Sequence, residues 1–194
     1  MSFVLCSYYT FDTPYREEIR NLILSVKDMP LQTYFKGIEN RGSWEANTHY
    51  KAQFIKEMMD RYPEKAIVYV DADAVVRKYP ALFDTIPPCD LAAYFRDWRF
   101  AKNELLSGTL YVGNTEAARN LIDLWIKKNG ENPGVWEQKN LHSVIALLDG
   151  DLRISKLPVE YCCIYDSVER KAGCQPVIEH FQRSRRYRKA INAR

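Results

Sequence analysis

Long hydrophobic runs are missing from this sequence, and so are the usual signs of secretion and of cysteine-based structure. No segment reaches the ~20 consecutive apolar residues that a membrane helix needs, and the start of the chain lacks the basic region of a signal peptide. The 5 cysteines are odd in number and form no C-x-x-C pair, which argues against a zinc site or a disulfide framework. These absences predict a cytoplasmic protein with reduced thiols and no membrane span.

Internal repeats, low-complexity tracts and linkers are absent as well. The 194 residues suffice for one compact domain and are too few for two of ordinary size. With 46% hydrophobic and 27% charged residues, the composition is that of a folded globular protein rather than of a disordered one. We therefore expect one domain over residues 1–182, followed by a tail over residues 183–194.

Negative charge is missing from the last part of the chain. From Phe181 to Arg194 there are five arginines and one lysine but no acidic residue, whereas the remainder of the chain is mildly acidic. This asymmetry indicates an anionic partner. Nucleic acid is the leading candidate, because arginines pair with phosphates and the ring of Tyr187 can stack on a base. A membrane surface or an anionic glycan would also satisfy this charge, and a solvated terminal tail is the remaining alternative.

Apolar segments of strand length alternate with amphipathic segments of helix length. The clearest strand is 66–70 (AIVYV), whose continuous apolar run predicts burial on both faces of a sheet. Strands that alternate with helices predict an α/β sandwich around a mostly parallel sheet, in which ligands bind at the carboxyl ends of the strands. The expected strands are 3–7, 31–38, 66–70, 91–95, 105–112, 152–157 and 176–181, and the expected helices begin near residues 14, 47, 115 and 136.

Two aspartates, Asp71 and Asp73, follow the strand 66–70 directly. Carboxylates this close repel each other unless a cation lies between them, and hard oxygen ligands suit Mg²⁺ or Mn²⁺. The remaining coordination positions of such an ion can take diphosphate oxygens. The pattern therefore predicts a metal site at the end of a buried strand. A pair of solvated carboxylates is the alternative.

A haloacid-dehalogenase-like phosphatase is one class of enzyme that carries such a pattern. In those enzymes an apolar strand is followed by D-x-D-x-[TV], which residues 71–75 (DADAV) match with Asp71 as the nucleophile. That motif ordinarily ends the first strand of the fold, whereas two expected strands and two expected helices precede it here. The second acidic pair of that fold would have to be Asp149 and Asp151, which follow a helix.

The sequence resembles the nucleotide-diphospho-sugar transferases of GT-A fold, particularly retaining families and phage-type relatives, over nearly its whole length. Four short motifs in the expected order carry the resemblance: 71–73 (DAD) for the D-x-D metal motif, 105–111 (LLSGTLY) for the N-S-G strand, 136–138 (WEQ) for the D-Q helix start and 178–181 (IEHF) for the H-F motif. Leu106 stands where asparagine is common, and Glu137 replaces aspartate. The resemblance implies a single-domain, three-layer sandwich around a mostly parallel sheet.

The same resemblance implies roles for individual residues. Asp71 and Asp73 are expected to bind Mn²⁺ or Mg²⁺, with His180 as a third ligand in its neutral form. The ion then neutralises charge on the departing nucleoside diphosphate. Gln138 is expected to contact the sugar or orient the reaction, as a catalytic residue beside the two aspartates. The residues expected around the nucleotide sugar are Ser7, Tyr8, Tyr9, Lys51, Asp71, Ser107, Gly108 and Arg183.

These patterns predict a metal-dependent glycosyltransferase that moves a sugar from a nucleotide-diphosphate donor, UDP-sugar first among them, to an acceptor that the sequence does not identify. The resemblance favours retention of configuration. Residues 96–100 (RDWRF) are expected to form an acceptor wall or lid, with Asp97 and Glu104 as candidate carboxylates on that side. A non-catalytic module that binds nucleotide sugar or nucleic acid is a further alternative, against which the intact metal-binding residues argue.

Overall fold

The computed structural model describes residues 2–98, 101–148 and 150–193. A six-stranded sheet forms its middle layer. The strands are β1 (Phe3–Thr10), β2 (Thr33–Ile38), β3 (Ala66–Val70), β5 (Leu91–Trp98), β6 (Ala101–Val112) and β7 (Ile154–Lys156), in the spatial order β2-β1-β3-β6-β5-β7. β1 pairs in parallel with β2 and β3, β5 pairs in parallel with β7, and β6 is antiparallel to both of its neighbours. The predicted mostly parallel sheet is confirmed.

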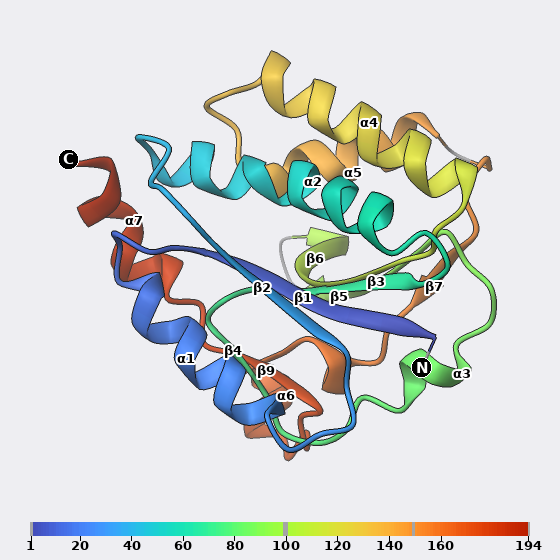
Figure 1. Cartoon of the computed structure of the whole chain (residues 1–194), viewed down its shortest axis with the longest axis horizontal. Helices are drawn as coiled ribbons and strands as arrows, with labels where there is room; N and C mark the ends of the chain where they lie inside the picture. The colour runs from blue at the N-terminus through green and yellow to red at the C-terminus, as the bar shows by residue number, and fades with distance from the viewer. Residues whose placement is uncertain (1, 99–100, 149, 194) are drawn as a thin grey trace.

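A layer of helices covers one face of this sheet (Figure 1). It consists of α2 (Trp44–Arg61), α4 (Glu116–Glu131) and α5 (Glu137–Leu147). Large side chains such as Trp125, Phe54 and Tyr69 fill the space between these helices and the sheet and are almost fully buried. The helix α2 begins three residues before its expected start, because the Oγ of Ser43 accepts a hydrogen bond from the backbone N of Ala46 and caps the helix there.

Shorter elements cover the opposite face (Figure 1). They include α1 (Tyr15–Val26), α3 (Leu82–Thr85), α6 (Val168–Lys171), a 3₁₀ turn over Val159–Tyr161, and a small sheet of β4 (Ala74–Val76), β8 (Cys163–Ile164) and β9 (Ile178–His180) in the order β4-β9-β8. Leu22 of α1 and Val76 of β4 pack with Phe3 and Val68 of the central sheet. The predicted three-layer α/β sandwich is confirmed.

The hairpin of β5 and β6 is longer than the sequence predicts. β5 continues to Trp98, so that residues 96–98 of the expected acceptor loop are strand, while residues 99 and 100 lie outside the described part. Arg96 pairs with Glu104 across the hairpin, with 2.9 Å between Nη2 and Oε2.

The basic segment at the end of the chain contains a helix, α7 (Ser184–Asn192). Figure 1 shows α7 beside the start of α2 and the start of α1, at the edge where β1 ends. Ile191 is buried, and the hydroxyl of Tyr187 donates to Glu18 of α1 over 2.6 Å. The segment 184–192 is therefore packed against the domain.

Gly113 marks the place where the chain leaves β6 toward α4. A Cβ atom there would lie 2.2 Å from the carbonyl oxygen of Cys89, so the two backbones cross at a distance that leaves room for glycine alone. The backbone N of Gly113 donates to the carbonyl of Asp90 over 3.0 Å. This close crossing fixes how α4 departs from the sheet.

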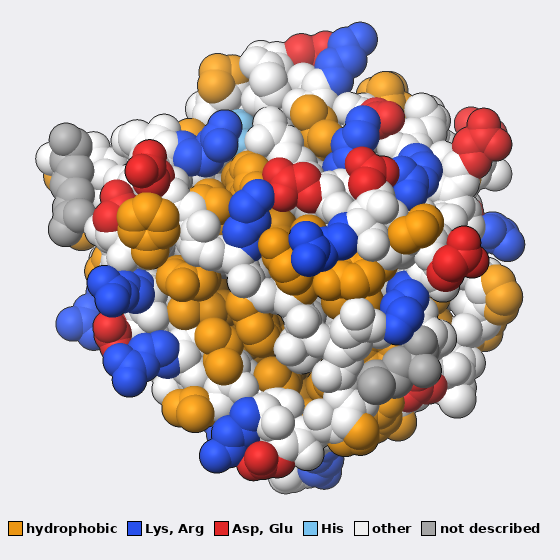
Figure 2. All heavy atoms as spheres, viewed as in Figure 1, with side chains coloured by type: hydrophobic (Ala, Val, Ile, Leu, Met, Phe, Trp, Pro, Cys, Tyr) orange, Lys and Arg blue, Asp and Glu red, His pale blue; other side chains and the backbone are white. Residues whose placement is uncertain are grey.

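Side chains on the outside of the molecule are mixed in character. Figure 2 shows hydrophobic side chains between the charged residues of the upper layer and α1, where the edge strand β2 runs.

Among residues 2–98, 101–148 and 150–193, none of the helices has both the length and the apolar character of a membrane span. All five cysteines are free thiols, as expected.

Candidate functional site

A pocket of about 440 Å³ lies at the carboxyl ends of β1 and β3. Its walls come from the starts of α2 and α5, from the β5–β6 hairpin, and from the start of α7. The volume lies within the usual range for sites that bind small molecules. The pocket occupies the position at which open α/β sheets ordinarily bind their ligands.

Asp71, Asp73 and His180 come together on one side of this pocket. One ligand atom from each of the three lies within 4.8 Å of the others. A turn brings the two aspartates out of β3, since the backbone N of Ala74 donates to the carbonyl of Asp71 over 3.0 Å. Pairing of β4 with β9 places Ala74 opposite His180. The small second sheet thus delivers the histidine to the aspartates.

Asp73 is nearly buried, with an exposed fraction of 8%. Its Oδ2 accepts a hydrogen bond of 2.6 Å from the backbone N of Arg183. Burial, together with the negative charge of Asp71, raises the pKa of Asp73 to about 7. Both conditions disfavour a second negative charge at this point, and a bound cation would remove the penalty.

His180 is buried and neutral. Burial lowers its pKa to about 4, and its Nε2 lies 2.8 Å from the Oγ1 of Thr109. When the Thr109 hydroxyl accepts the Nε2–H, Nδ1 keeps its lone pair, which is the form of histidine that binds metals. A Cβ on Gly108 would lie 3.1 Å from Nδ1 and 3.4 Å from Oδ2 of Asp71, so glycine allows the two ligands to approach.

The donor set of this cluster fits a divalent cation. Two carboxylates supply negative charge and hard oxygen atoms, and a neutral imidazole adds a nitrogen ligand. The raised pKa of Asp73 follows from burial beside the negative charge of Asp71, and the lowered pKa of His180 follows from burial, which keeps the imidazole in the neutral form that binds metals. Asp71, Asp73 and His180 are therefore the residues that would hold a metal ion.

Lys51 joins three walls of the pocket. Its Nζ lies 2.6 Å from Oε1 of Glu137, 3.0 Å from Oδ1 of Asp71 and 3.1 Å from the carbonyl oxygen of Ser107. The same Glu137 oxygen accepts from the Ser107 hydroxyl over 2.8 Å. Gln138 adds to the group, because its Oε1 accepts from the backbone N of Ser107 over 3.1 Å.

Lys51 and Glu137 are both buried, and their mutual attraction keeps both side chains ionised. Burial alone would lower the pKa of Lys51, but the charges of Asp71 and Glu137 outweigh it, and the pKa of Lys51 is raised. Burial alone would raise the pKa of Glu137, but the charge of Lys51 lowers it. Lys51 is thus a fixed positive charge beside Asp71.

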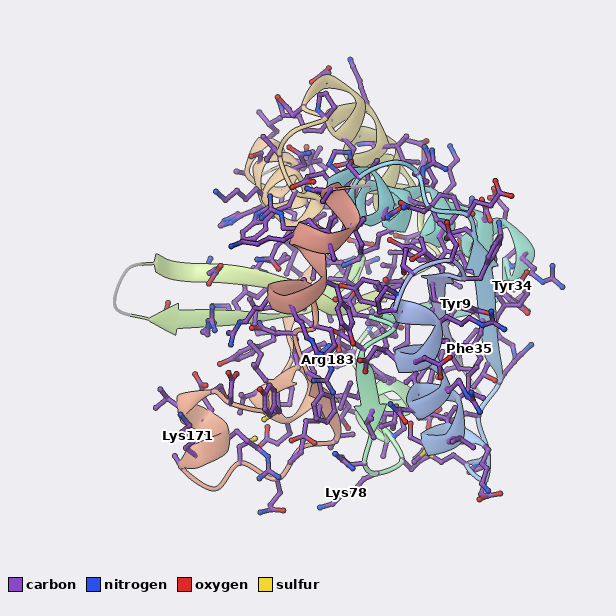
Figure 3. The ribbon with its side chains drawn as sticks, turned by 90° about the vertical axis from the view of Figure 1, so that its left-hand side faces the viewer. Tyr9, Tyr34, Phe35, Lys78, Lys171 and Arg183 are labelled. Carbon is purple, nitrogen blue, oxygen red and sulfur yellow. The ribbon has the colours of Figure 1, made fainter. Side chains whose placement is uncertain are left out.

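Residues expected around the nucleotide lie in different environments. Ser7 is fully buried, and its hydroxyl has no hydrogen-bond partner within the described residues. The hydroxyl of Tyr8 donates to the carbonyl of Asn47 over 2.7 Å, and both Tyr8 and Tyr9 line the pocket. Arg183 lies where β9 passes into α7 (Figure 3), and its Nε is 3.1 Å from Oε1 of Glu18. Its backbone, rather than its guanidinium, reaches the aspartates.

Several residues in or beside the pocket were not among the predicted site residues, although Thr109, Trp136 and Glu137 lie in the motifs that carry the resemblance. Thr109 holds His180, Glu137 holds Lys51, and the indoles of Trp44 and Trp136 line the wall formed by the starts of α2 and α5. The sequence feature that could have identified the two tryptophans as pocket residues is their position at the starts of helices, which face the carboxyl edge of the sheet. The partnership of Lys51 with Glu137 joins residues 86 apart and leaves no local signal.

Of the acidic pair that the phosphatase interpretation requires, Asp151 does not line this pocket. Asp151 lines a separate surface depression together with Asp90 and Arg153. Asp149 lies outside the described residues. The arrangement around Asp71 therefore has no second acidic pair from this segment.

Solved glycosyltransferase structures share this fold. One is a glycosyltransferase involved in the glycosylation of the major capsid of PBCV-1, with a TM-score of 0.75 and 15% identity over 100% of this chain and 98% of that chain. Another is GlyE of Streptococcus pneumoniae TIGR4, with a TM-score of 0.60 and 19% identity over 93% of this chain and 54% of GlyE. The chain thus spans about half the length of GlyE.

The galactosyltransferase LgtC, solved with donor and acceptor sugar analogs, also matches, with a TM-score of 0.52 and 9% identity over 93% of this chain and 87% of LgtC. No protein-family model matches the sequence, and no curated protein sequence is similar to it. At these identities the likeness shows a common fold, and the fold predicted from the short motifs is confirmed.

Proposed function

We propose that the chain is a metal-dependent glycosyltransferase that takes a sugar from a nucleotide-diphosphate donor, UDP-sugar in the first instance. The observation that carries this proposal is the cluster of Asp71, Asp73 and His180 at the end of β3, inside the pocket of a fold shared with glycosyltransferases. Mn²⁺ or Mg²⁺ is the ion proposed. When bound, it would supply the positive charge that stabilises the departing diphosphate.

The chain's own residues hold and orient this site. Lys51 fixes Asp71 through its 3.0 Å ion pair, and the backbone N of Arg183 fixes Asp73. Thr109 fixes the ring of His180. With all three ligands held in place before the donor arrives, less ordering is needed when it binds.

Gln138 is proposed to contact the transferred sugar. Its Oε1 is held by the backbone N of Ser107 over 3.1 Å, and the residue lines the pocket. Retention is supported by the resemblance of the motifs to retaining families. It is also supported by Glu104, a carboxylate of the pocket that is ion-paired with Arg96 and so does not present a free base to an acceptor.

The test is joint stabilisation by metal and nucleotide. Mn²⁺ and UDP together should raise the free energy of unfolding by about 2.7 kcal/mol at a hundredfold excess over the dissociation constant, and more than either alone. Asp73→Asn should lose this gain and keep the fold, as checked by circular dichroism. Equal stabilisation of the variant, or steady turnover of simple phosphate esters by the wild type, would refute the proposal.

Nucleic acid is not supported as the acceptor. Three of the five arginines in the segment 183–194 form ion pairs within the chain, and these pairs are Arg183–Glu18, Arg185–Asp166 and Arg188–Glu45. Arginines that are already paired have less charge to offer to phosphates. Location in the cytoplasm stays a prediction.

A further inference from the structure

Two indoles meet in the wall of the pocket between α2 and α5. Trp44 is the first residue of α2, Trp136 directly precedes α5, and both line the pocket. Their ring centroids are 6.2 Å apart with an angle of 65° between the planes, so that they form a corner. An indole face combines a broad apolar surface with a negative electrostatic potential.

Residues of α2 and α7 hold the two rings of this corner in place. The guanidinium of Arg188 lies 4.8 Å from the ring centroid of Trp44 and 5.8 Å from that of Trp136, and it is ion-paired with Glu45. The backbone N of Trp44 donates to Oδ1 of Asn192 over 2.6 Å. Side chains fixed in this way lose little conformational entropy when a ligand packs on them.

Trp136 has a feature that packing does not explain. Its Nε1 is buried and has no hydrogen-bond partner within the described part of the chain. A buried indole N–H ordinarily finds an acceptor, and leaving it unpaired costs stability. A loss of stability of this kind is expected at residues whose role is to bind a ligand rather than to stabilise the fold.

Two arginines that line the pocket are each paired with a carboxylate, whereas the Nζ of Lys139 lies 5.5 Å from the ring centroid of Trp136. Arg96 lies 2.9 Å from Glu104, and Arg185 lies 2.7 Å from Asp166. Paired charges place donors beside acceptors, which suits hydroxyl groups because each hydroxyl both donates and accepts. An anionic ligand would find no concentrated positive potential in these pairs.

From these observations we infer that Trp44 and Trp136 form the acceptor subsite, and that the acceptor is a neutral sugar whose ring packs on the indole corner. The C–H groups on one face of a sugar ring carry partial positive charge and fit the negative face of an indole. The inference rests on the proposed function and extends it by naming the acceptor class.

The position of the corner favours the acceptor over the nucleotide base. Trp136 is followed at once by Glu137 and Gln138, whose side chains reach Ser107 beside the metal-binding cluster. A ligand on Trp136 therefore lies next to the place proposed for the transferred sugar. The residues expected around the base, Ser7, Tyr8 and Tyr9, instead belong to β1.

Saturation-transfer NMR with methyl β-glucoside and methyl β-galactoside tests the inference, using the full chain loaded with Mg²⁺ and UDP. Trp136→Leu keeps apolar volume without a ring face and should weaken binding of these glycosides about tenfold. Trp136→Phe keeps a ring face and should remain near wild type. Leu147→Ala is the matched control, because Leu147 ends the same helix and is 76% exposed.

Stabilisation by Mg²⁺ and UDP is measured on the same proteins and should be equal in all of them. If Trp136→Leu loses that stabilisation and keeps its glycoside affinity, the corner belongs to the donor and the inference is wrong. It is also wrong if neither glycoside binds the loaded wild type, or if methyl glucuronide or a short RNA binds more tightly than both. A wild type that Mg²⁺ and UDP do not stabilise would instead refute the proposed function.

Discussion

A single hydroxyl decides how His180 faces the aspartates. Thr109 is fully buried on β6, and its Oγ1 lies 2.8 Å from Nε2 of the histidine. An outer partner of this kind sets which ring nitrogen carries the proton and how the ring is turned. The geometry of the cluster therefore depends on a residue that itself would not touch the ion.

Thr109→Val keeps the shape of the side chain and removes the hydroxyl. We expect the affinity for Mn²⁺ in the presence of UDP to fall by about 10–100-fold, because the ring of His180 is no longer held. Titration of Mn²⁺ by electron paramagnetic resonance measures this affinity. Thr109→Ser is the control and should stay close to wild type; equal affinity of the valine variant would mean that packing alone orients the ring.

At the scale of elements, Lys51 links α2 to α5 through a buried ion pair with Glu137, and to β6 through a hydrogen bond to the carbonyl of Ser107. Removing one member of a buried ion pair leaves the other without compensation. Lys51→Met should therefore lower the free energy of unfolding by about 3–5 kcal/mol, as measured by urea denaturation.

The double variant Lys51→Met/Glu137→Gln should recover part of this loss, because it removes the stranded carboxylate. A matched surface control is Lys56→Met on the same helix, whose partner Asp123 is about half exposed. The account of the buried network fails if Lys51→Met is no more destabilising than Lys56→Met.

Asp90 joins β5 to α4 and to the segment before β7. It accepts hydrogen bonds from Arg153 over 2.9 Å and from the hydroxyl of Thr115, the cap of α4, over 2.7 Å. Hydrogen bonds from Arg153 lower the pKa of Asp90 to about 2. An acid whose pKa is depressed by folding stabilises the native state above its unfolded pKa, and that stability is lost as the pH falls toward the folded value.

Asp90→Asn should accordingly destabilise the protein at pH 7, and the difference from wild type should shrink as the pH falls from about 4 toward 2. Denaturant unfolding at pH 7, 4 and 3 measures the difference. Asp28→Asn, at a side chain that is 87% exposed, should show no such trend. A difference that stays constant with pH would assign the effect of Asp90 to shape rather than charge.

The sequence predicted elements where one local signal dominates. β3 begins and ends at the predicted residues because its run is apolar throughout and polar residues bound it. The approach of His180 to Asp71 could be inferred from resemblance alone, since it depends on the pairing of β4 with β9, strands of three residues each. Residues 96–98 were predicted as loop because two adjacent charged residues interrupt the apolar run, and the cross-strand ion pair of Arg96 with Glu104 leaves no local signal.

At the scale of the whole molecule, α7 closes one side of the pocket. Ser184 and Arg185 line the pocket, and Asn192 and Arg188 contact the start of α2. Both sheets are complete without this helix. The fold and the closure of the pocket are therefore separable properties of the chain.

Deletion of residues 184–194 should leave a cooperatively folded protein with a lower melting temperature. Stabilisation by Mn²⁺ and UDP should be clearly reduced, because the pocket loses the wall that Ser184 and Arg185 form. Thermal unfolding with and without the two ligands measures both effects. Undiminished stabilisation of the truncated chain would show that α7 has no part in donor binding.

Two glycines, one within β6 and one directly after it, differ in what a side chain at their positions would contact. At Gly113 a side chain would strike the carbonyl of Cys89 at 2.2 Å, so every descendant that keeps this crossing must keep glycine, whatever it does. At Gly108 a side chain would press on His180 and Asp71 at 3.0–3.4 Å, and that pressure matters while those residues hold a metal. A homologue with glycine at position 113 but not at position 108 would thus be identified as one that kept the fold and lost the proposed metal site.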